Sequence, residues 1–292
     1  MQIQKLDLPR CKVGEGPVWD VAEQALYYID IVDRKVFRWD PATGEHTTWE
    51  VPDMIGSMAL RGRGTKPDGA IVALVTGIHY LDFTSGEISP FALMDPPNPA
   101  LQLADGKVDR RGRFVFGTSH RTMKEPLGGL WSLGTDGKLT QIDDDIHLGN
   151  GPCWSPDDRI FYHSDSLRHM IYAYDYDIET GMVSGRREFF DTSAYGPIPD
   201  GATVDTDGNI WVAICEGGVV LCLSPEGQVL REVKFPTNIP ASCMFMGPGL
   251  GRMFVPTIDP SCVGKPSEPD DGLIFLIEGL GATGIPEPRY GG

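Results

Sequence analysis

Three oxygen-bearing side chains occupy matching positions along the 292-residue sequence: Glu15, Asn150 and Asp200 each have glycine as a neighbour. Two carboxylates and an amide carbonyl that lie close together are costly to desolvate unless a cation lies between them. With a divalent ion they form an all-oxygen, partly open site. We therefore predict a metal site. The alternative is that each is only a turn residue, because Asn-Gly and Asp-Gly are common in turns.

Short β-strands are the elements that would bring these three residues together. Runs such as 159–163 and 170–176 are rich in β-branched and aromatic residues, and clusters of Gly, Pro, Asp and Ser separate them. Such alternation of strand and turn predicts antiparallel modules of about fifty residues with four strands each. No helix-length amphipathic segment interrupts the pattern, so βαβ units are not expected.

The modules recur along the whole sequence. They open at positions 15, 57, 105, 150, 200 and 242, which are 42, 48, 45, 50 and 42 residues apart. Four strands repeated at this period are typical of a β-propeller. We predict an all-β fold, a six-bladed β-propeller with four antiparallel strands per blade, as a single domain over residues 1–292. The last module lacks an outer strand, so residues 3–8 are expected to pair with residues 273–278 and close the last blade.

The propeller architecture gathers the three polar residues. The inner strands of all blades run in the same sense along the central channel, so residues at their starts converge on one mouth of that channel. The proline-rich segment 94–100 precedes the third inner strand and cannot belong to a central sheet. We expect it to form a loop on the same rim, where it would act as a lid.

Composition excludes several classes of protein. The formal net charge of −16 disfavours binding to nucleic acid, and no apolar run is long enough for a membrane span. The six cysteines show no CxxC spacing and lie mostly in apolar runs, which predicts free, buried thiols in a reducing compartment. The N-terminal residues lack the apolar core of a signal peptide. We expect a cytoplasmic protein.

Several motifs together resemble those of one family. They are GEGPVW (14–19), DGKVD (105–109), NGPCWS (150–155) and IPDG (198–201). The sequence resembles the regucalcin–gluconolactonase (senescence marker protein) family across all six modules. The resemblance implies a six-bladed propeller with one axial divalent cation that hydrolyses sugar lactones. It also implies that Glu15, Asn150 and Asp200 are the metal ligands and that Asp200 is the general base.

The substrate-binding positions depart from that family. Sugar lactonases usually carry arginine and asparagine where this sequence has Gln102 and Ala104, so the hydroxyl-binding pair is replaced. His120 and Arg121 follow in a segment where relatives often have acidic residues. They would bring positive charge to the mouth and bind an anionic group of the substrate; the alternative is an ordinary surface arginine. His163 is expected to be a hydrogen-bonded core histidine.

These observations predict a metal-dependent lactonase acting on a small sugar lactone, one with an anionic substituent. The cation would be Ca²⁺, Zn²⁺, Mn²⁺, Mg²⁺ or Fe²⁺, because an all-oxygen donor set with open positions accepts each of them. The alternatives are a non-catalytic, metal-binding regulatory propeller and a related esterase or organophosphate hydrolase. A monomer or small homo-oligomer is expected.

Overall fold

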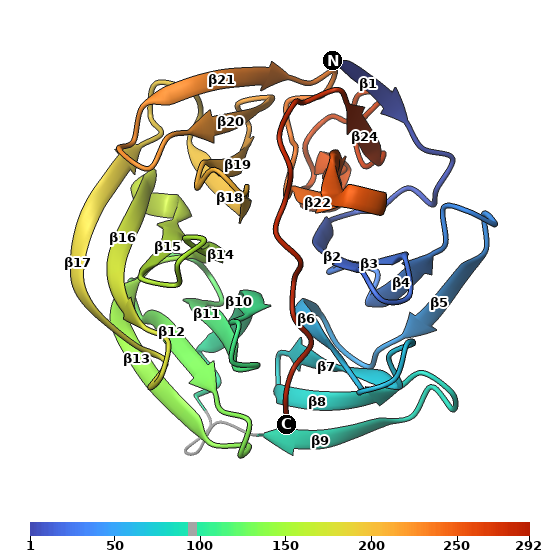
Figure 1. Ribbon diagram of the computed structural model, residues 1–292, viewed down its shortest axis with the longest axis vertical. Coiled ribbons are helices and arrows are strands. Elements are labelled where there is room, and N and C mark those ends of the chain that lie inside the picture. Colours follow the sequence, from blue (N-terminus) through green and yellow to red (C-terminus); the bar gives the residue numbers. More distant parts are fainter. Residues whose placement is uncertain (93–97) are drawn as a thin grey trace.

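The computed structural model describes residues 1–92 and 98–292. Six four-stranded antiparallel sheets surround a central axis (Figure 1). The predicted all-β, six-bladed propeller is confirmed. The described residues contain no α-helix, and their helical turns are the 3₁₀ segments η1 (Ser166–Arg168), η2 (Pro248–Leu250) and η3 (Pro260–Val263). None of these helices is long or apolar enough to cross a membrane.

Within each of the first five blades the chain runs from the inner strand outward, so the order of the strands in the chain is also their order from the axis to the rim. The first blade contains β2 (Gly14–Asp20), β3 (Ala25–Asp30), β4 (Lys35–Trp39) and β5 (His46–Glu50). The second contains β6 (Ile55–Arg61), β7 (Gly69–Leu74), β8 (Gly77–Asp82) and β9 (Ile88–Ala92). The third contains β10 (Leu101–Val108), β11 (Phe114–His120), β12 (Gly128–Leu133) and β13 (Leu139–Ile146). The fourth contains β14 (Gly149–Trp154), β15 (Ile160–Asp165), β16 (Met170–Asp177) and β17 (Met182–Asp191). The fifth contains β18 (Ile198–Val204), β19 (Ile210–Cys215), β20 (Val219–Leu223) and β21 (Val229–Lys234).

The sixth blade joins the two ends of the chain. Its strands are β22 (Met244–Met246), β23 (Arg252–Val255), β24 (Phe275–Glu278) and the N-terminal β1 (Gln2–Lys5). Ile3 lies opposite Ile277, and the predicted closure by the N-terminal strand is therefore confirmed. The strand is shorter than expected: it ends at Lys5, and one further backbone hydrogen bond of 2.9 Å joins Leu6 N–H to Ile274 C=O.

Packing between blades explains the apolar runs in the sequence. Every residue of β3, β7 and β19 is buried, because each of these strands lies inside a sheet that is covered on both faces by neighbouring blades. The outer strands β17 and β21 are mostly exposed. Tryptophans and phenylalanines fill the spaces between sheets; Trp19, Trp211 and Phe245 belong to one such cluster. All six cysteines are free, as predicted, and all but Cys262 are buried.

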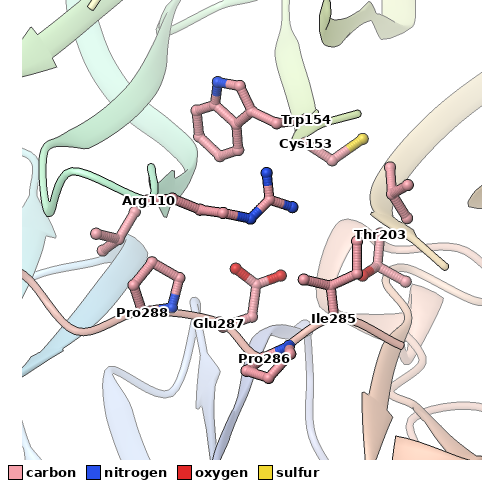
Figure 2. A pocket seen from close by; sticks show the side chains of 10 residues that line it. Arg110, Cys153, Trp154, Thr203, Ile285, Pro286, Glu287 and Pro288 are labelled. Carbon is pink, nitrogen blue, oxygen red and sulfur yellow. The ribbon is translucent and has the colours of Figure 1, made fainter. Parts of the chain in front are cut away.

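After β24 the C-terminal segment crosses the face of the propeller toward β9 (Figure 1). It covers the channel end at which the inner strands finish. Arg289 binds both carboxylate oxygens of Asp20 at 2.6 and 2.9 Å, and Tyr290 donates to Gly134 C=O at 2.7 Å. Glu287 projects from the same segment into a pocket that Arg110 and Trp154 also line (Figure 2). Tyr290 N–H also donates to Leu60 C=O of blade two at 2.8 Å, so the segment ties blades one, two and three together.

Buried charge is paired under this segment. The ammonium of Lys107, on inner strand β10, lies 3.3 Å from Glu287 Oε1 and donates to Ala202 C=O at 2.6 Å. Burial lowers the pKa of Lys107, but the neighbouring Glu287 and Asp105 carboxylates more than offset this, and the pKa is raised overall. The ammonium therefore stays charged inside the channel.

Candidate metal and substrate site

Glu15, Asn150 and Asp200 line one cavity of about 520 Å³ at the channel end where the inner strands begin. Glu15 comes from β2, Asn150 from β14 and Asp200 from β18, which belong to blades one, four and five. The structure thus brings the three residues to the same mouth of the channel, as the repeat spacing predicts. Their role as metal ligands remains a prediction.

A backbone irregularity follows each of the three residues. The register with the second strand of the blade shifts between Glu15 and Val18 and between Asn150 and Cys153. It shifts again between Pro199 and Ala202, beside Asp200. Such bulges re-aim side chains, which here directs them toward the channel mouth.

Glycine is required at two of these bulges. Gly16 and Gly151 have φ values of 50° and 58°, in the left-handed region that side chains disfavour. At Gly151 space is short as well, since a Cβ atom there would lie 2.6 Å from the backbone oxygen of Asp200. Gly16 and Gly151 therefore allow a backbone conformation that other residues disfavour, and Gly151 also allows blades four and five to approach closely.

The orientation of Asn150 follows from its hydrogen bonds. Ser166 Oγ lies 2.6 Å from Pro199 C=O, to which only the hydroxyl can donate. Ser166 must therefore accept at 2.9 Å from the Nδ2 of Asn150. This arrangement reserves the Oδ1 of Asn150 for another partner, and a carbonyl oxygen of this kind is a suitable cation ligand. The role of Ser166 in orienting Asn150 was not predicted from the sequence.

One carboxylate oxygen of Glu15 has no hydrogen-bond partner among the described residues. Its Oε2 accepts from Gly16 N–H at 2.7 Å, whereas Oε1 is buried and has no partner among the described residues. Glu15 is only 6% exposed, and its pKa is raised well above the ordinary value, first by burial and then by the charges of Asp200 and Asp105. Such a carboxylate favours either a proton or a cation beside it.

Asp105 is a member of the site that sequence reasoning did not include. It lines the same cavity, with Oδ1 accepting from Gly106 N–H at 2.7 Å and Oδ2 from Gly151 N–H at 2.9 Å. Burial raises its pKa, while Lys107 below it lowers it. Because both oxygens are used by backbone donors, Asp105 anchors the bulge beside Asn150. A signal was present: Asp105-Gly106 opens the third module at the same phase as Asp200-Gly201.

The donor set fits a hard divalent cation. Asp200 is 8% exposed, and its pKa is raised well above the ordinary value by burial and by Asp105. Within residues 1–92 and 98–292, no three His, Cys, Asp or Glu side chains form a metal-binding group by themselves. The amide oxygen of Asn150 is therefore needed to complete a three-ligand set with Glu15 and Asp200. Mixed carboxylate and amide oxygens are the ligands that Ca²⁺, Mg²⁺ and Mn²⁺ prefer.

Three of the four predicted substrate-binding residues line the cavity, and one does not. Gln102, Ala104 and Arg121 line the cavity, whereas His120 is not among its described lining residues. His120 Nδ1 lies 3.2 Å from the hydroxyl of Thr122. The predicted lid, 94–100, falls largely on residues 93–97, which lie outside the described residues.

His163 lies behind the site, in β15, with its ring against Gly149. Its predicted burial is confirmed, but the expected hydrogen bond is not found: neither ring nitrogen has a partner among the described residues. Burial lowers the pKa of this imidazole to about 3. The ring is therefore neutral in the folded protein at neutral pH.

This depressed pKa predicts a stability loss in acid. Between the ordinary value of 6.5 and about 3, the unfolded chain binds a proton at residue 163 that the folded chain does not, so stability falls as pH falls through this window. At about pH 4.5 the loss attributable to His163 is about 2.5 kcal/mol relative to pH 7. Denaturant unfolding of wild type and His163→Phe at about pH 7 and about pH 4.5 measures it. Equal losses in the two proteins would contradict the assignment.

Comparison with known proteins agrees with this architecture. Residues 13–259 match the family model described as "SMP-30/Gluconolactonase/LRE-like region". Zebrafish (Danio rerio) regucalcin is 35% identical over 288 residues, which cover 96% of this chain and 95% of that protein. The solved structure of a luciferin-regenerating enzyme matches with a TM-score of 0.91 and 28% identity, covering 99% of this chain and 98% of that one. Regucalcin from Agrobacterium tumefaciens, described as a calcium-binding protein, matches with a TM-score of 0.89 and 25% identity over 98% of this chain and 96% of its own.

The fold and the site thus define a six-bladed propeller with a cavity at one end of its axis, in which Glu15, Asp105 and Asp200 lie together. The chain belongs to the SMP-30/gluconolactonase/LRE-like family. The family resemblance seen in the sequence motifs is confirmed.

Proposed function

We propose that the protein is a metal-dependent lactonase that hydrolyses a small cyclic ester to the open hydroxy acid. The observation that carries this proposal is the group formed by Glu15, Asn150 and Asp200. It places two carboxylates and an oriented amide oxygen in one cavity, with Glu15 Oε1 buried and without a hydrogen-bond donor. The gluconolactonase in the family description supports a lactone as substrate, and a sugar lactone is the first class to test.

The chemistry divides between the cation and this chain's side chains. A bound divalent cation polarises the lactone carbonyl and stabilises negative charge on its oxygen. Asp200 accepts the proton of the water that adds to the carbonyl carbon, because its carboxylate lies in the same cavity as the proposed substrate position. The ring C–O bond then breaks, and the leaving alkoxide takes a proton to give the hydroxy acid. Glu15 and Asn150 would hold the cation in place together with Asp200.

A lactone panel measured with and without chelator tests this function. Ring opening is measured by pH-stat titration of the acid released. We expect it to cease after chelation and to return when one divalent metal is added back. Metal analysis of the protein before chelation identifies the cation. Lactone hydrolysis that survives exhaustive chelation would contradict the proposal.

The alternatives give different results in the same panel. A non-catalytic, metal-binding propeller is favoured by the description of the Agrobacterium tumefaciens regucalcin as a calcium-binding protein. It would bind the ion, gain thermal stability from it and open no lactone. An esterase or organophosphate hydrolase would act on open-chain esters or phosphotriesters in preference to lactones.

Arg121 is proposed to anchor an anionic substituent of the substrate. It lines the cavity, and its Nε donates to Leu101 C=O at 3.2 Å, which holds the guanidinium near the rim. Arg121→Ala should raise KM for a lactone carrying a carboxylate roughly tenfold, with little change for its neutral analogue, since the lost contact is mainly ground-state binding. Arg159→Ala, at a highly exposed position outside the cavity wall, is the control. Equal KM changes for both lactones would make Arg121 an ordinary surface residue.

A further inference from the structure

The wall of the cavity is largely apolar. Aliphatic side chains reach it from four blades and from η3; they include Val75, Leu148, Ile198, Ile258 and Val263. No Ser, Thr, Tyr, Trp or His is among its described lining residues. A volume of about 520 Å³ lies within the range of roughly 300–1,000 Å³ typical of small-molecule sites. The cavity can therefore enclose an apolar group in addition to a lactone ring.

Most polar groups of this wall already have a partner or a role. Both oxygens of Asp105 accept backbone N–H groups, and Glu216 forms an ion pair of 2.6 Å with Lys265. Glu15, Asn150 and Asp200 are assigned to the cation. Gln102 and Arg121 are then the described lining side chains left to bind a substrate.

Two side chains cannot satisfy the several hydroxyl groups of a sugar ring. Hydroxyls enclosed by aliphatic walls without hydrogen-bond partners lose their bonds to water, which weakens binding. Ala104, which lines the cavity beside Gln102, has no polar side-chain atom to offer. The wall is poorly suited to a polyhydroxylated lactone.

Apolar side chains are also exposed at this mouth. Met54 is 41% exposed, Met123 is 44% exposed and Val263 is 70% exposed, and all three line the cavity. They come from segments that follow β5, β11 and β23. Large apolar side chains left open to water around a concave site are typical of surfaces that bind apolar ligands.

From these observations we infer that the substrate is a lactone with an apolar body, carrying an alkyl or aryl substituent where a sugar lactone carries hydroxyls. This inference rests on the proposed lactonase function and replaces the sugar lactone by an apolar lactone; the anionic group proposed to bind Arg121 would then lie on the alkyl or aryl substituent. The carbonyl end of the ring faces Asp200, and the substituent lies against the aliphatic wall and the two methionines of the rim. Burial of the substituent supplies the binding free energy that hydroxyl contacts supply in a sugar site.

Matched lactones test the inference. Glucono-δ-lactone, unsubstituted δ-valerolactone and δ-valerolactone with a hexyl substituent share one ring size and differ in what the ring carries. We expect kcat/KM of the metal-loaded protein to rise from the sugar lactone to the unsubstituted ring and further to the hexyl derivative, by about tenfold or more overall. The corresponding lactams are not hydrolysed, so their binding can be measured by calorimetry. The hexyl lactam should bind more tightly than the unsubstituted lactam.

Variants at the rim supply the structural control. Met54→Gln and Met123→Gln together keep side-chain length but introduce an amide, and we expect about a tenfold loss of kcat/KM for the hexyl lactone alone. Met182→Gln, at a methionine of β17 that is 43% exposed and outside the cavity wall, should change nothing. Both changed positions are exposed, so folding should be retained.

The outcomes separate the substrate inference from the function. A preference for the sugar lactone, or a loss in the rim variant that is equal for all lactones, would overturn the apolar substrate while leaving the lactonase intact. If no lactone is opened, the lactonase proposal fails, and lactam binding then decides the inference: tighter binding of the hexyl lactam would support an apolar ligand, and equal binding of the two lactams would overturn it.

Discussion

Replacing Asp200 by asparagine is expected to abolish lactone hydrolysis while leaving the propeller folded. The change removes the proton acceptor and one charged cation ligand together, so we expect kcat to fall by about 10³-fold or more. Folding should survive, because Asp200 lies beside Glu15 and Asp105 in a buried, mutually repelling group. The metal-free variant should therefore melt at the same temperature as the metal-free wild type or higher, and it should gain less from added metal.

Asp207 provides the matched control. It lies in the same blade as Asp200, is also followed by glycine, and is exposed in the turn between β18 and β19. Asp207→Asn should leave kcat and the response to metal unchanged. Full activity of Asp200→Asn would end the proposed mechanism. If the variant is folded and inactive but binds the metal as tightly as wild type, Asp200 acts as the general base and is not a metal ligand.

The largest stability effect is expected at the opposite end of the channel, from Glu287→Gln. Lys107 and Glu287 form an ion pair with side chains that are only 9% and 17% exposed. Removing the negative partner leaves the ammonium buried, and among the described residues the Ala202 carbonyl is then its remaining hydrogen-bond acceptor. Breaking a buried pair from one side costs about 3 kcal/mol, a large part of the stability of an ordinary domain. Denaturant unfolding and the melting temperature measure the loss.

An exposed ion pair serves as the control that separates the effect of burial on stability from the effect of losing a charge. Lys12 and Asp33 lie 2.6 Å apart with side chains 50% and 32% exposed, and Asp33→Asn should have little effect because solvent screens that pair. Lys107→Met in the Glu287→Gln background should recover part of the loss, since it removes the uncompensated charge. A Glu287→Gln protein as stable as wild type would show that the C-terminal segment covers the channel without contributing a needed charge.

These two predictions assign different tasks to the two ends of one channel. At the mouth, Glu15 and Asp200 form no salt bridge within residues 1–92 and 98–292, and burial and neighbouring carboxylates raise their pKa values. At the far end, Lys107 has a carboxylate partner supplied by the C-terminal segment. The proposed metal position thus coincides with buried carboxylates whose pKa values are raised, whereas the buried charge at the far end is paired.

Repeat period and residue type were sufficient to predict the fold. A blade buries both faces against its neighbours, so each module must repeat the same pattern of short apolar strands and turns, and that pattern is visible in one sequence. Residues at the same phase of each module necessarily meet at one end of the channel, which is why Glu15, Asn150 and Asp200 could be placed together. Asp105 had the same signal, but its hydrogen bond to Gly151 N–H depends on how blades three and four approach each other.

The character of the cavity wall depended on tertiary structure alone. Met54 lies between β5 and β6, and Ile258 and Val263 lie between β23 and β24. In such connecting segments, sequence spacing does not indicate which rim a side chain faces or how near it comes to another. The Lys107–Glu287 pair joins residues 180 positions apart, one of them in a segment outside the repeats. His163 showed the same limit: a strand pattern predicts its burial, but whether a ring nitrogen meets a donor or acceptor depends on the neighbouring blade. Local sequence encodes strands and their phase, whereas contacts between blades arise only when the ring closes.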